Sequence, residues 1–212
     1  MSVEGLDVFL RSLLDAQPAG PVEIAWQGGE PTLRGLDFYR RAVGLAESLR
    51  RPRQRVSHTL QTNGTLLDDA WGEFLAEHHF LVGLSIDEPA DVHDVYRVNR
   101  AGRGTHAQVV RGWNTLQRQR VDTNVLCTVH AANADRPLSV YRYFRDELGV
   151  RFLQFIPRVE RVGAADLAIP EAGWRGDGGG RLLYRKYGNA MTSRSDVPRG
   201  WGGLVRPVFV AG

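Results

Sequence analysis

The residues best suited to chemistry stand in a short glycine string, Gln27-Gly28-Gly29-Glu30-Pro31, which follows an apolar run. The two glycines let the backbone approach a ligand closely, because neither carries a side chain that would obstruct it. Together with backbone carbonyls, the Glu30 carboxylate could bind an ammonium group. For the two glycines alone, an ordinary tight turn is the favoured interpretation. The string is not a phosphate-binding loop, since it matches neither the Gly-Lys-Ser/Thr nor the G-x-G-x-x-G pattern.

Four further positions carry polar side chains that could bind a ligand. Asn63 starts an Asn-Gly pair, which by itself indicates only a turn. Ser85 and Asp87 would share one face of a strand and could bind ribose hydroxyls, while capping of the strand end is an equally good interpretation. Arg97 could hold a carboxylate in a bidentate way, although, taken alone, it is more simply a surface arginine. Both interpretations stand for each of these residues.

Apolar patterns alternate between helix and strand along residues 3–156. Strands are expected at 22–26, 56–60, 80–86, 124–129 and 150–156, and helices at 3–17, 36–49, 67–78, 105–117 and 138–148. This alternation predicts an α/β fold with a parallel sheet and right-handed crossovers, either doubly wound or a partial barrel. In both architectures ligands bind at the carboxyl ends of the strands. The glycine string, Asn63 and Ser85 all stand at such ends, so the function is expected there.

Composition narrows the class of protein. The 212 residues include one cysteine, Cys127, so this sequence cannot supply a disulfide framework or a metal site of several thiolates. Cys127 lies in an apolar strand and is expected to be a small buried hydrophobe. No run of about eighteen apolar residues and no signal-peptide pattern is present, so we expect no membrane partner and a cytoplasmic location. The net charge of +3 falls in the glycine-rich stretch after residue 162, and nucleic acid is not expected as a partner.

Taken in order, five strings of the sequence resemble one family. They are Trp26–Leu33, Leu60–Leu66, Leu81–Asp87, Asn124–Cys127 and Phe152–Pro157. These strings are similar to those of the anaerobic sulfatase-maturating enzymes, which belong to the radical S-adenosylmethionine (SAM) superfamily. Gly-Gly-Glu-Pro after a strand carries the resemblance to the superfamily, and Gln-Thr-Asn-Gly and Leu-Gln-Phe-Ile-Pro narrow it to the sulfatase-maturase branch. The resemblance extends over residues 3–162.

The resemblance implies a partial (β/α)6 barrel that uses SAM and a [4Fe-4S] cluster. In that family the cluster donates an electron to SAM. The resulting adenosyl radical takes a hydrogen from the β-carbon of a cysteine or serine in a sulfatase polypeptide, which yields formylglycine. By resemblance, the SAM-binding residues would be Gln27, Gly28, Gly29 and Glu30 around the methionine part, Asn63 at the same rim, Ser85 and Arg97 on the ribose and carboxylate, and Val159 against the adenine.

The sequence also departs from the family. Glu88 stands where the family has glycine after Ser-Ile-Asp, so a rearranged turn is expected. The family's first strand with its C-x-x-x-C-x-x-C loop and its cysteine-rich C-terminal domain with the catalytic base are missing, so no catalytic or metal-binding residue is assigned. We expect residues 1–162 to form an incomplete radical SAM partial barrel of five parallel strands, followed by an irregular glycine-rich tail at 163–212. The expected function is sulfatase maturation, in an inactive or incomplete fragment; the alternative is a non-catalytic domain that binds SAM or a peptide.

Overall fold

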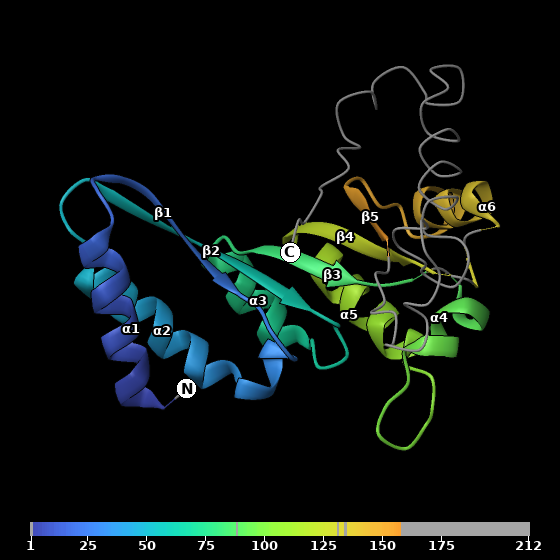
Figure 1. The fold of residues 1–212 in the computed structure, drawn as a ribbon, viewed down its shortest axis with the longest axis horizontal. Coiled ribbons are helices and arrows are strands. Elements are labelled where there is room, and N and C mark those ends of the chain that lie inside the picture. Colours follow the sequence, from blue (N-terminus) through green and yellow to red (C-terminus); the bar gives the residue numbers. More distant parts are fainter. Residues whose placement is uncertain (1, 88, 131, 134, 158–212) are drawn as a thin grey trace, which may run out of the picture. The chain divides into compact units, whose positions relative to one another are not determined.

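The computed structural model describes residues 2–87, 89–130, 132–133 and 135–157 of the chain. In this part of the chain, five β-strands form one sheet in the order of the sequence (Figure 1). The strands are β1 (Gly20–Trp26), β2 (Gln54–Thr62), β3 (Leu81–Ser85), β4 (Asp122–Val129) and β5 (Leu153–Pro157). The helices are α1 (Val3–Ala16), α2 (Leu36–Leu49), α3 (Asp69–Glu77), α4 (Ala90–Tyr96), α5 (His106–Arg118) and α6 (Pro137–Arg142), with a 3₁₀ turn at Pro31–Arg34 and a π-helical turn at Tyr143–Glu147.

The parallel sheet predicted from the alternation of elements is confirmed. Strands β1 and β2 pair in parallel with Val22 opposite Val56, and β2 pairs with β3. Strands β4 and β5 pair in parallel with Val125 opposite Leu153. All five expected strands are present. The tail expected at 163–212, and with it the domain boundary, lies outside the described residues.

Helix α4 is the element that the sequence patterns do not predict. His93 lies in the middle of α4. The helix has seven residues, less than two full turns, so no apolar period can repeat within it. It buries Val92 and His93. None of the described helices is long and apolar enough to cross a membrane.

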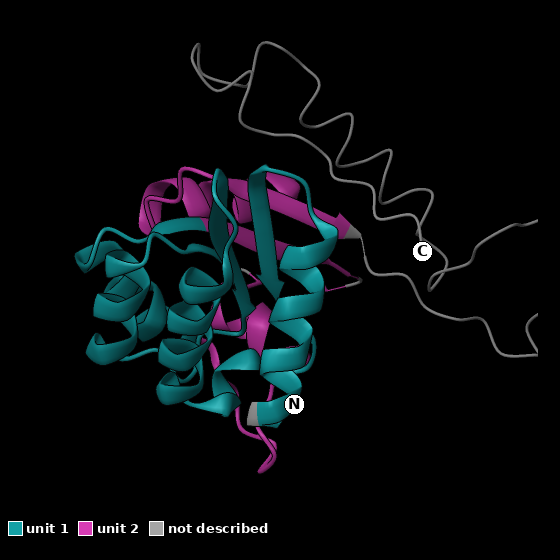
Figure 2. Ribbon diagram, turned by 90° about the vertical axis from the view of Figure 1, so that its left-hand side faces the viewer, with its two compact units in different colours: residues 1–84, 108–123 teal, residues 85–107, 124–212 magenta. Residues whose placement is uncertain are grey.

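The chain divides into two compact units (Figure 2). Of the described residues, unit 1 contains those at 2–84 and 108–123, drawn in teal, and unit 2 contains those at 85–107 and 124–157, drawn in magenta. The glycine string and Asn63 belong to unit 1, whereas Ser85 and Arg97 belong to unit 2.

The core of unit 1 lies between its helices and its strands. Helices α1 and α2 lie side by side along one face of β1 and β2 (Figure 1). Helix α1 begins after Ser2, whose hydroxyl accepts a hydrogen bond of 3.1 Å from the backbone N–H of Gly5. It buries a stripe spaced four residues apart, formed by Leu6, Leu10 and Leu14. Each such leucine contributes about 1.5–3 kcal/mol by leaving water.

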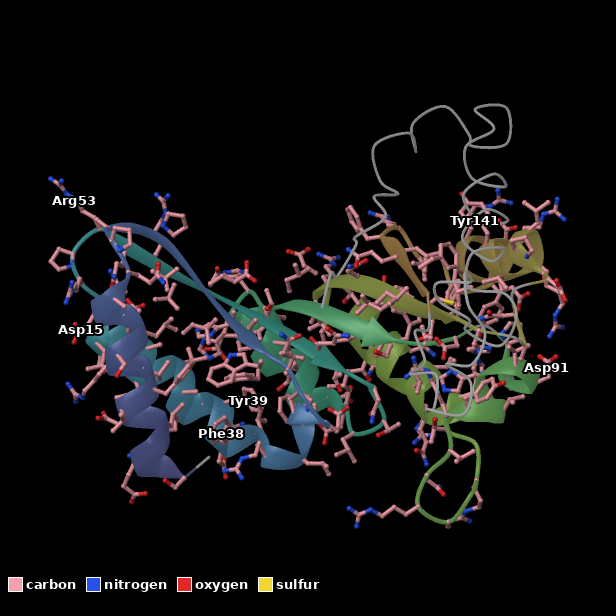
Figure 3. All side chains as sticks on the ribbon, viewed as in Figure 1. Asp15, Phe38, Tyr39, Arg53, Asp91 and Tyr141 are labelled. Atoms are coloured by element: carbon pink, nitrogen blue, oxygen red, sulfur yellow. The ribbon has the colours of Figure 1, made fainter. Side chains whose placement is uncertain are left out.

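Aromatic rings extend this core towards the end of β1. Phe38 and Tyr39, labelled on α2 in Figure 3, make edge-to-face contacts with the Trp26 ring at centroid distances of 5.9 and 5.5 Å. The Trp26 indole N–H donates to Nδ1 of the buried His58 at 3.3 Å. Burial lowers the pKa of His58 to about 4. The Tyr39 hydroxyl donates to the Pro31 carbonyl oxygen at 3.1 Å, so the core fixes the chain directly after the glycine string.

Candidate functional site

The glycine string turns sharply at the carboxyl end of β1. Gly28 and Gly29 have φ angles of +99° and +58°, a region that side chains other than glycine rarely adopt. A Cβ atom added at either position would meet no other atom within 4 Å. Backbone conformation, not crowding, therefore requires glycine here, and open space borders both residues. This geometry fits the tight-turn interpretation and leaves room for a ligand beside the backbone.

The Glu30 carboxylate joins the end of β1 to the end of β2. Its Oε1 atom accepts hydrogen bonds from the backbone N–H and the hydroxyl of Thr32, at 3.0 and 2.6 Å, and from the Thr62 hydroxyl at 2.7 Å. Its Oε2 atom accepts one hydrogen bond, from the backbone N–H of Asn63 at 2.7 Å. A carboxylate oxygen has two lone pairs, so Oε2 can accept a further hydrogen bond from a ligand cation. The structure thus brings together Glu30 and Asn63, two of the predicted site residues.

The turn after β2 is held from several sides. The Asn63 side-chain oxygen accepts from the backbone N–H and the hydroxyl of Thr65, at 3.0 and 2.8 Å. The Gly64 N–H donates to the Thr62 hydroxyl oxygen at 3.0 Å. A Cβ atom on Gly112, in helix α5, would collide with the Gly64 carbonyl oxygen. A glycine inside a predicted helix is the sequence signal that could have indicated this close approach.

In unit 2, Asp87 and Arg97 form a bidentate ion pair. The Arg97 Nε–H donates to Oδ2 of Asp87, and Nη2 donates to Oδ1 at 3.1 Å. The backbone N–H of Thr128, in β4, also donates to Oδ1, at 2.7 Å. The Asp87 side chain is 3% exposed and that of Arg97 is 26% exposed. The surface-arginine interpretation of Arg97 is therefore wrong.

The same pair bears on the two interpretations of Asp87. Its buried carboxylate accepts from Arg97 and from the Thr128 N–H of the neighbouring strand, which fits the capping of the strand end, and the ribose interpretation stays a prediction. Arg97 also donates from Nη2 to the Thr128 hydroxyl at 3.2 Å. Within the described part of the chain, its Nη1 group has no partner. Arg97 was predicted from the sequence to bind a ligand carboxylate, and its Nη1 group is available for such a bond.

Ser85 ends strand β3 and is half-buried. Among the described residues its hydroxyl makes no hydrogen bond, so it can donate to or accept from a ligand. Gln27 is exposed after β1. Val159 lies outside the described residues, and the assignments of Gln27, Ser85 and Val159 to SAM stay predictions.

The residue that sequence reasoning missed is His93. Its ring is fully buried in unit 2, where Nδ1 lies 3.1 Å from the Asp87 nitrogen and Nε2 lies 3.2 Å from the Thr105 hydroxyl. Burial, helped by the charge of Arg97, lowers the pKa of His93 to about 4. The available signal is spacing, because His93 stands four residues before Arg97 and both follow Asp87 closely.

The residues present do not fit an iron–sulfur cluster. No group of three or more His, Cys, Asp or Glu side chains in the described residues could hold a metal ion. Cys127, which is the sole cysteine of the sequence, is buried in β4, as expected for a small hydrophobe. A [4Fe-4S] cluster bound by three or four cysteine thiolates cannot be assembled from these donors.

The chain matches the family model of the radical SAM superfamily over residues 4–142. It is similar to the serine-type anaerobic sulfatase-maturating enzyme of Bacteroides thetaiotaomicron, with 40% identity over 162 residues, 76% of this chain and 39% of that protein. It is also similar to the cysteine-type enzyme of Clostridium perfringens, with 37% identity over 156 residues, 74% of this chain and 42% of that protein. The chain thus spans about two fifths of the length of these curated relatives.

Solved structures of similar proteins show the same relationship. The native enzyme anSMEcpe with bound AdoMet and the Cp18Cys peptide has a TM-score of 0.77 and 32% identity, covering 88% of this chain and 50% of that one. Streptococcus suis SuiB bound to S-adenosylmethionine has a TM-score of 0.57 and 17% identity, covering 92% of this chain and 40% of that one. The second likeness is one of fold alone.

Proposed function

Because the chain belongs to the radical SAM superfamily, we propose that it is the SAM-binding part of an anaerobic sulfatase-maturating enzyme. Its substrate would be a sulfatase polypeptide with a cysteine or serine at the position to be oxidised. The proposal concerns the portion of such an enzyme that this sequence contains.

The observation that carries the proposal is the position of the Glu30 carboxylate. It ties the Gly28-Gly29 turn to Asn63, at the carboxyl ends of two parallel strands, where ligands bind in this class of sheet. The turn borders open space, so a ligand ammonium can reach its backbone carbonyl oxygens. Oε2 of Glu30 offers the negative charge and a further lone pair for the methionine ammonium of SAM.

In unit 2, the Arg97 Nη1 group is the proposed donor to the SAM carboxylate. Arginine suits this role because its guanidinium keeps a positive charge and donates in a fixed plane. The Ser85 hydroxyl is the proposed ribose partner, and Val159 is assigned to the adenine by resemblance. Gln27 completes the set around the methionine part.

In the superfamily, reductive cleavage of SAM supplies the adenosyl radical that removes hydrogen from the substrate. The residues of this sequence do not provide for that cleavage, since they hold no cluster-binding set. This mismatch favours a second candidate function, a non-catalytic domain that binds SAM or a peptide. Both candidates require SAM binding or peptide binding at the same strand ends.

The binding of labelled SAM to the 212-residue protein, measured by equilibrium dialysis, tests the first candidate and the SAM-binding form of the second. Gly29→Val forces a β-branched residue into a positive φ and should weaken SAM binding at least about tenfold, a loss of about 1.4 kcal/mol. Gly102→Val is the matched control, because Gly102 has a φ of +70° and the same open surroundings on a loop of unit 2. Absence of saturable SAM binding, or equal losses in both variants, would overturn the proposal.

Peptide binding tests the proposed substrate class. A synthetic sulfatase peptide containing the target cysteine or serine should bind to the SAM-loaded chain, and a scrambled peptide of the same composition should not. Equal binding of the two peptides would remove the sulfatase assignment and leave SAM binding alone.

A further inference from the structure

We propose that His93 is a positioning residue for Arg97, whose guanidinium it aims by fixing the backbone at both ends of the Asp87–Arg97 pair. The role of Arg97 towards the SAM carboxylate rests on the proposed function. The positioning itself concerns residues of unit 2 alone.

Two backbone atoms of Asp87 lie close to the His93 Nδ1 atom, the nitrogen at 3.1 Å and the carbonyl oxygen at 3.2 Å. We assign the ring proton to Nε2, because the Thr105 hydroxyl donates to the Arg97 carbonyl oxygen at 2.9 Å and its oxygen then accepts from the His93 Nε2–H, 3.2 Å away. A neutral ring with a proton on Nε2 has an acceptor at Nδ1. The Asp87 backbone N–H donates to that atom at 3.1 Å. One ring therefore holds Asp87 directly and Arg97 through Thr105.

Backbone hydrogen bonds add to these contacts and restrain Asp87 and Arg97, the two residues of the ion pair. The backbone N–H of Thr105 also donates to the Arg97 carbonyl oxygen, at 3.2 Å, and the Arg97 N–H donates to the carbonyl oxygen of His93 at 3.0 Å. The carboxylate end is held separately, because the Thr128 N–H donates to Asp87 at 2.7 Å. His93 is thus the buried group that connects the turn at Asp87 to the end of α4 at Arg97.

The consequence for Arg97 is a fixed plane. Nε and Nη2 are both bound to Asp87, and a guanidinium held at two nitrogens cannot rotate. The direction of Nη1, which has no partner among the described residues, is then set before a ligand arrives. Fixing a donor in advance lowers the entropy that binding must overcome.

An apolar side chain could fill the same buried space, but it could not make these bonds. His93→Phe keeps an aromatic ring and removes both nitrogens. His93→Gln keeps an amide N–H that can donate to Thr105 and an oxygen that can accept from Asp87. His58→Phe is the matched control, because His58 is also a buried histidine of lowered pKa, in unit 1.

The first measurement needs no ligand. NMR hydrogen exchange of the Arg97 Nε–H, assigned by its loss in Arg97→Lys, reports whether the guanidinium is held. We expect slow exchange in the wild type, His93→Gln and His58→Phe, and exchange at least about tenfold faster in His93→Phe. Slow exchange in His93→Phe would overturn the positioning role. If His93→Phe does not fold, Thr105→Val breaks the same chain with the histidine in place and should speed exchange in the same direction.

The second measurement separates this role from the proposed function. The affinity ratio between SAM and decarboxylated SAM reports the carboxylate contact, and a merely structural role would lower both affinities equally. We expect the ratio to fall about tenfold in His93→Phe and Arg97→Lys and to recover in His93→Gln. An unchanged ratio with a released Arg97 would refute the carboxylate assignment while the positioning role stands. If the wild type binds no SAM, the proposed function fails, and the exchange rates alone decide the role of His93.

Discussion

Oε2 of Glu30 accepts a hydrogen bond of 2.7 Å from the backbone N–H of Asn63 and so connects the loop after β1 to the turn after β2. The other oxygen of the same carboxylate accepts three hydrogen bonds, from Thr32 and Thr62. All four donors are N–H or O–H groups. A carboxylate can accept from all four, whereas a side-chain amide has only one oxygen that accepts. The acid that would meet a ligand cation is thus also the group that shapes the site.

Glu30→Gln should weaken SAM binding and lower stability together. The amide has one oxygen and one NH₂ group. Either the Asn63 N–H or the donors of Thr32 and Thr62 would then face the NH₂ group, which cannot accept a hydrogen bond. The loss of charge and of one buried partner should lower SAM affinity about tenfold and the free energy of unfolding by about 1–3 kcal/mol. Dialysis with labelled SAM and urea unfolding check both values. Glu23→Gln, on an exposed position of β1, is the control, and equal behaviour of the two variants would contradict the role of Glu30.

Gly112→Ala should destabilise the protein although alanine favours helices. A Cβ atom at this position of α5 would collide with the Gly64 carbonyl oxygen, which belongs to the backbone of a tight turn. Overpacking of this kind costs about 1–3 kcal/mol, more than the gain of about 1 kcal/mol in helix propensity. Gly44→Ala, in α2, meets no atom within 4 Å and should be stabilising. Urea unfolding of both variants should therefore give opposite signs, and a stabilised Gly112→Ala would show that the turn at Gly64 can move.

Acid should destabilise the fold between about pH 6.5 and pH 4. The pKa values of His58 and His93 are lowered to about 4 in the folded chain, against about 6.5 when unfolded. The unfolded state therefore takes up protons first as the pH falls, so the stability present above pH 6.5 is lost towards pH 4. Each histidine accounts for at most about 3 kcal/mol, at 1.36 kcal/mol per pKa unit.

Variants of the two buried histidines test whether these groups cause the pH dependence of stability. Free energies of unfolding at pH 7 and pH 5 should differ less in His58→Phe and in His93→Gln than in the wild type. His58 faces His78, and His93 faces Arg97, Asp87, His106 and Asp94. His79→Asn changes an exposed histidine and should leave the pH dependence intact. An unchanged pH dependence in both buried variants would contradict this account.

The sequence predicted the sheet because its strands are apolar and its turns contain Gly, Pro and Asn at regular intervals. Val22 and Val56, each inside a predicted strand, lie opposite each other in parallel strands. The pairing of Asp87 with Arg97 was not predictable in this way, since ten residues and a short helix separate them and only the loop geometry brings them together. The hydrogen bonds from Thr62 and Asn63 to Glu30 were also not predictable. They join the ends of two strands, and their partners are 32 and 33 residues apart in the sequence.

The chain of 212 residues, incubated anaerobically with iron, sulfide and a reductant, should gain no [4Fe-4S] cluster and should not cleave SAM. Three or four thiolates hold such a cluster, whereas this sequence contains Cys127 alone, buried in β4. Iron and sulfide content, the iron–sulfur absorbance band and chromatographic detection of deoxyadenosine check the prediction. Cys127→Ala is the control for iron bound adventitiously at the thiol. Deoxyadenosine formed by the wild type above the level of this variant would contradict the prediction, because it would require cluster chemistry at one cysteine. SAM binding in the same samples, without cleavage, would favour the non-catalytic function for the chain by itself.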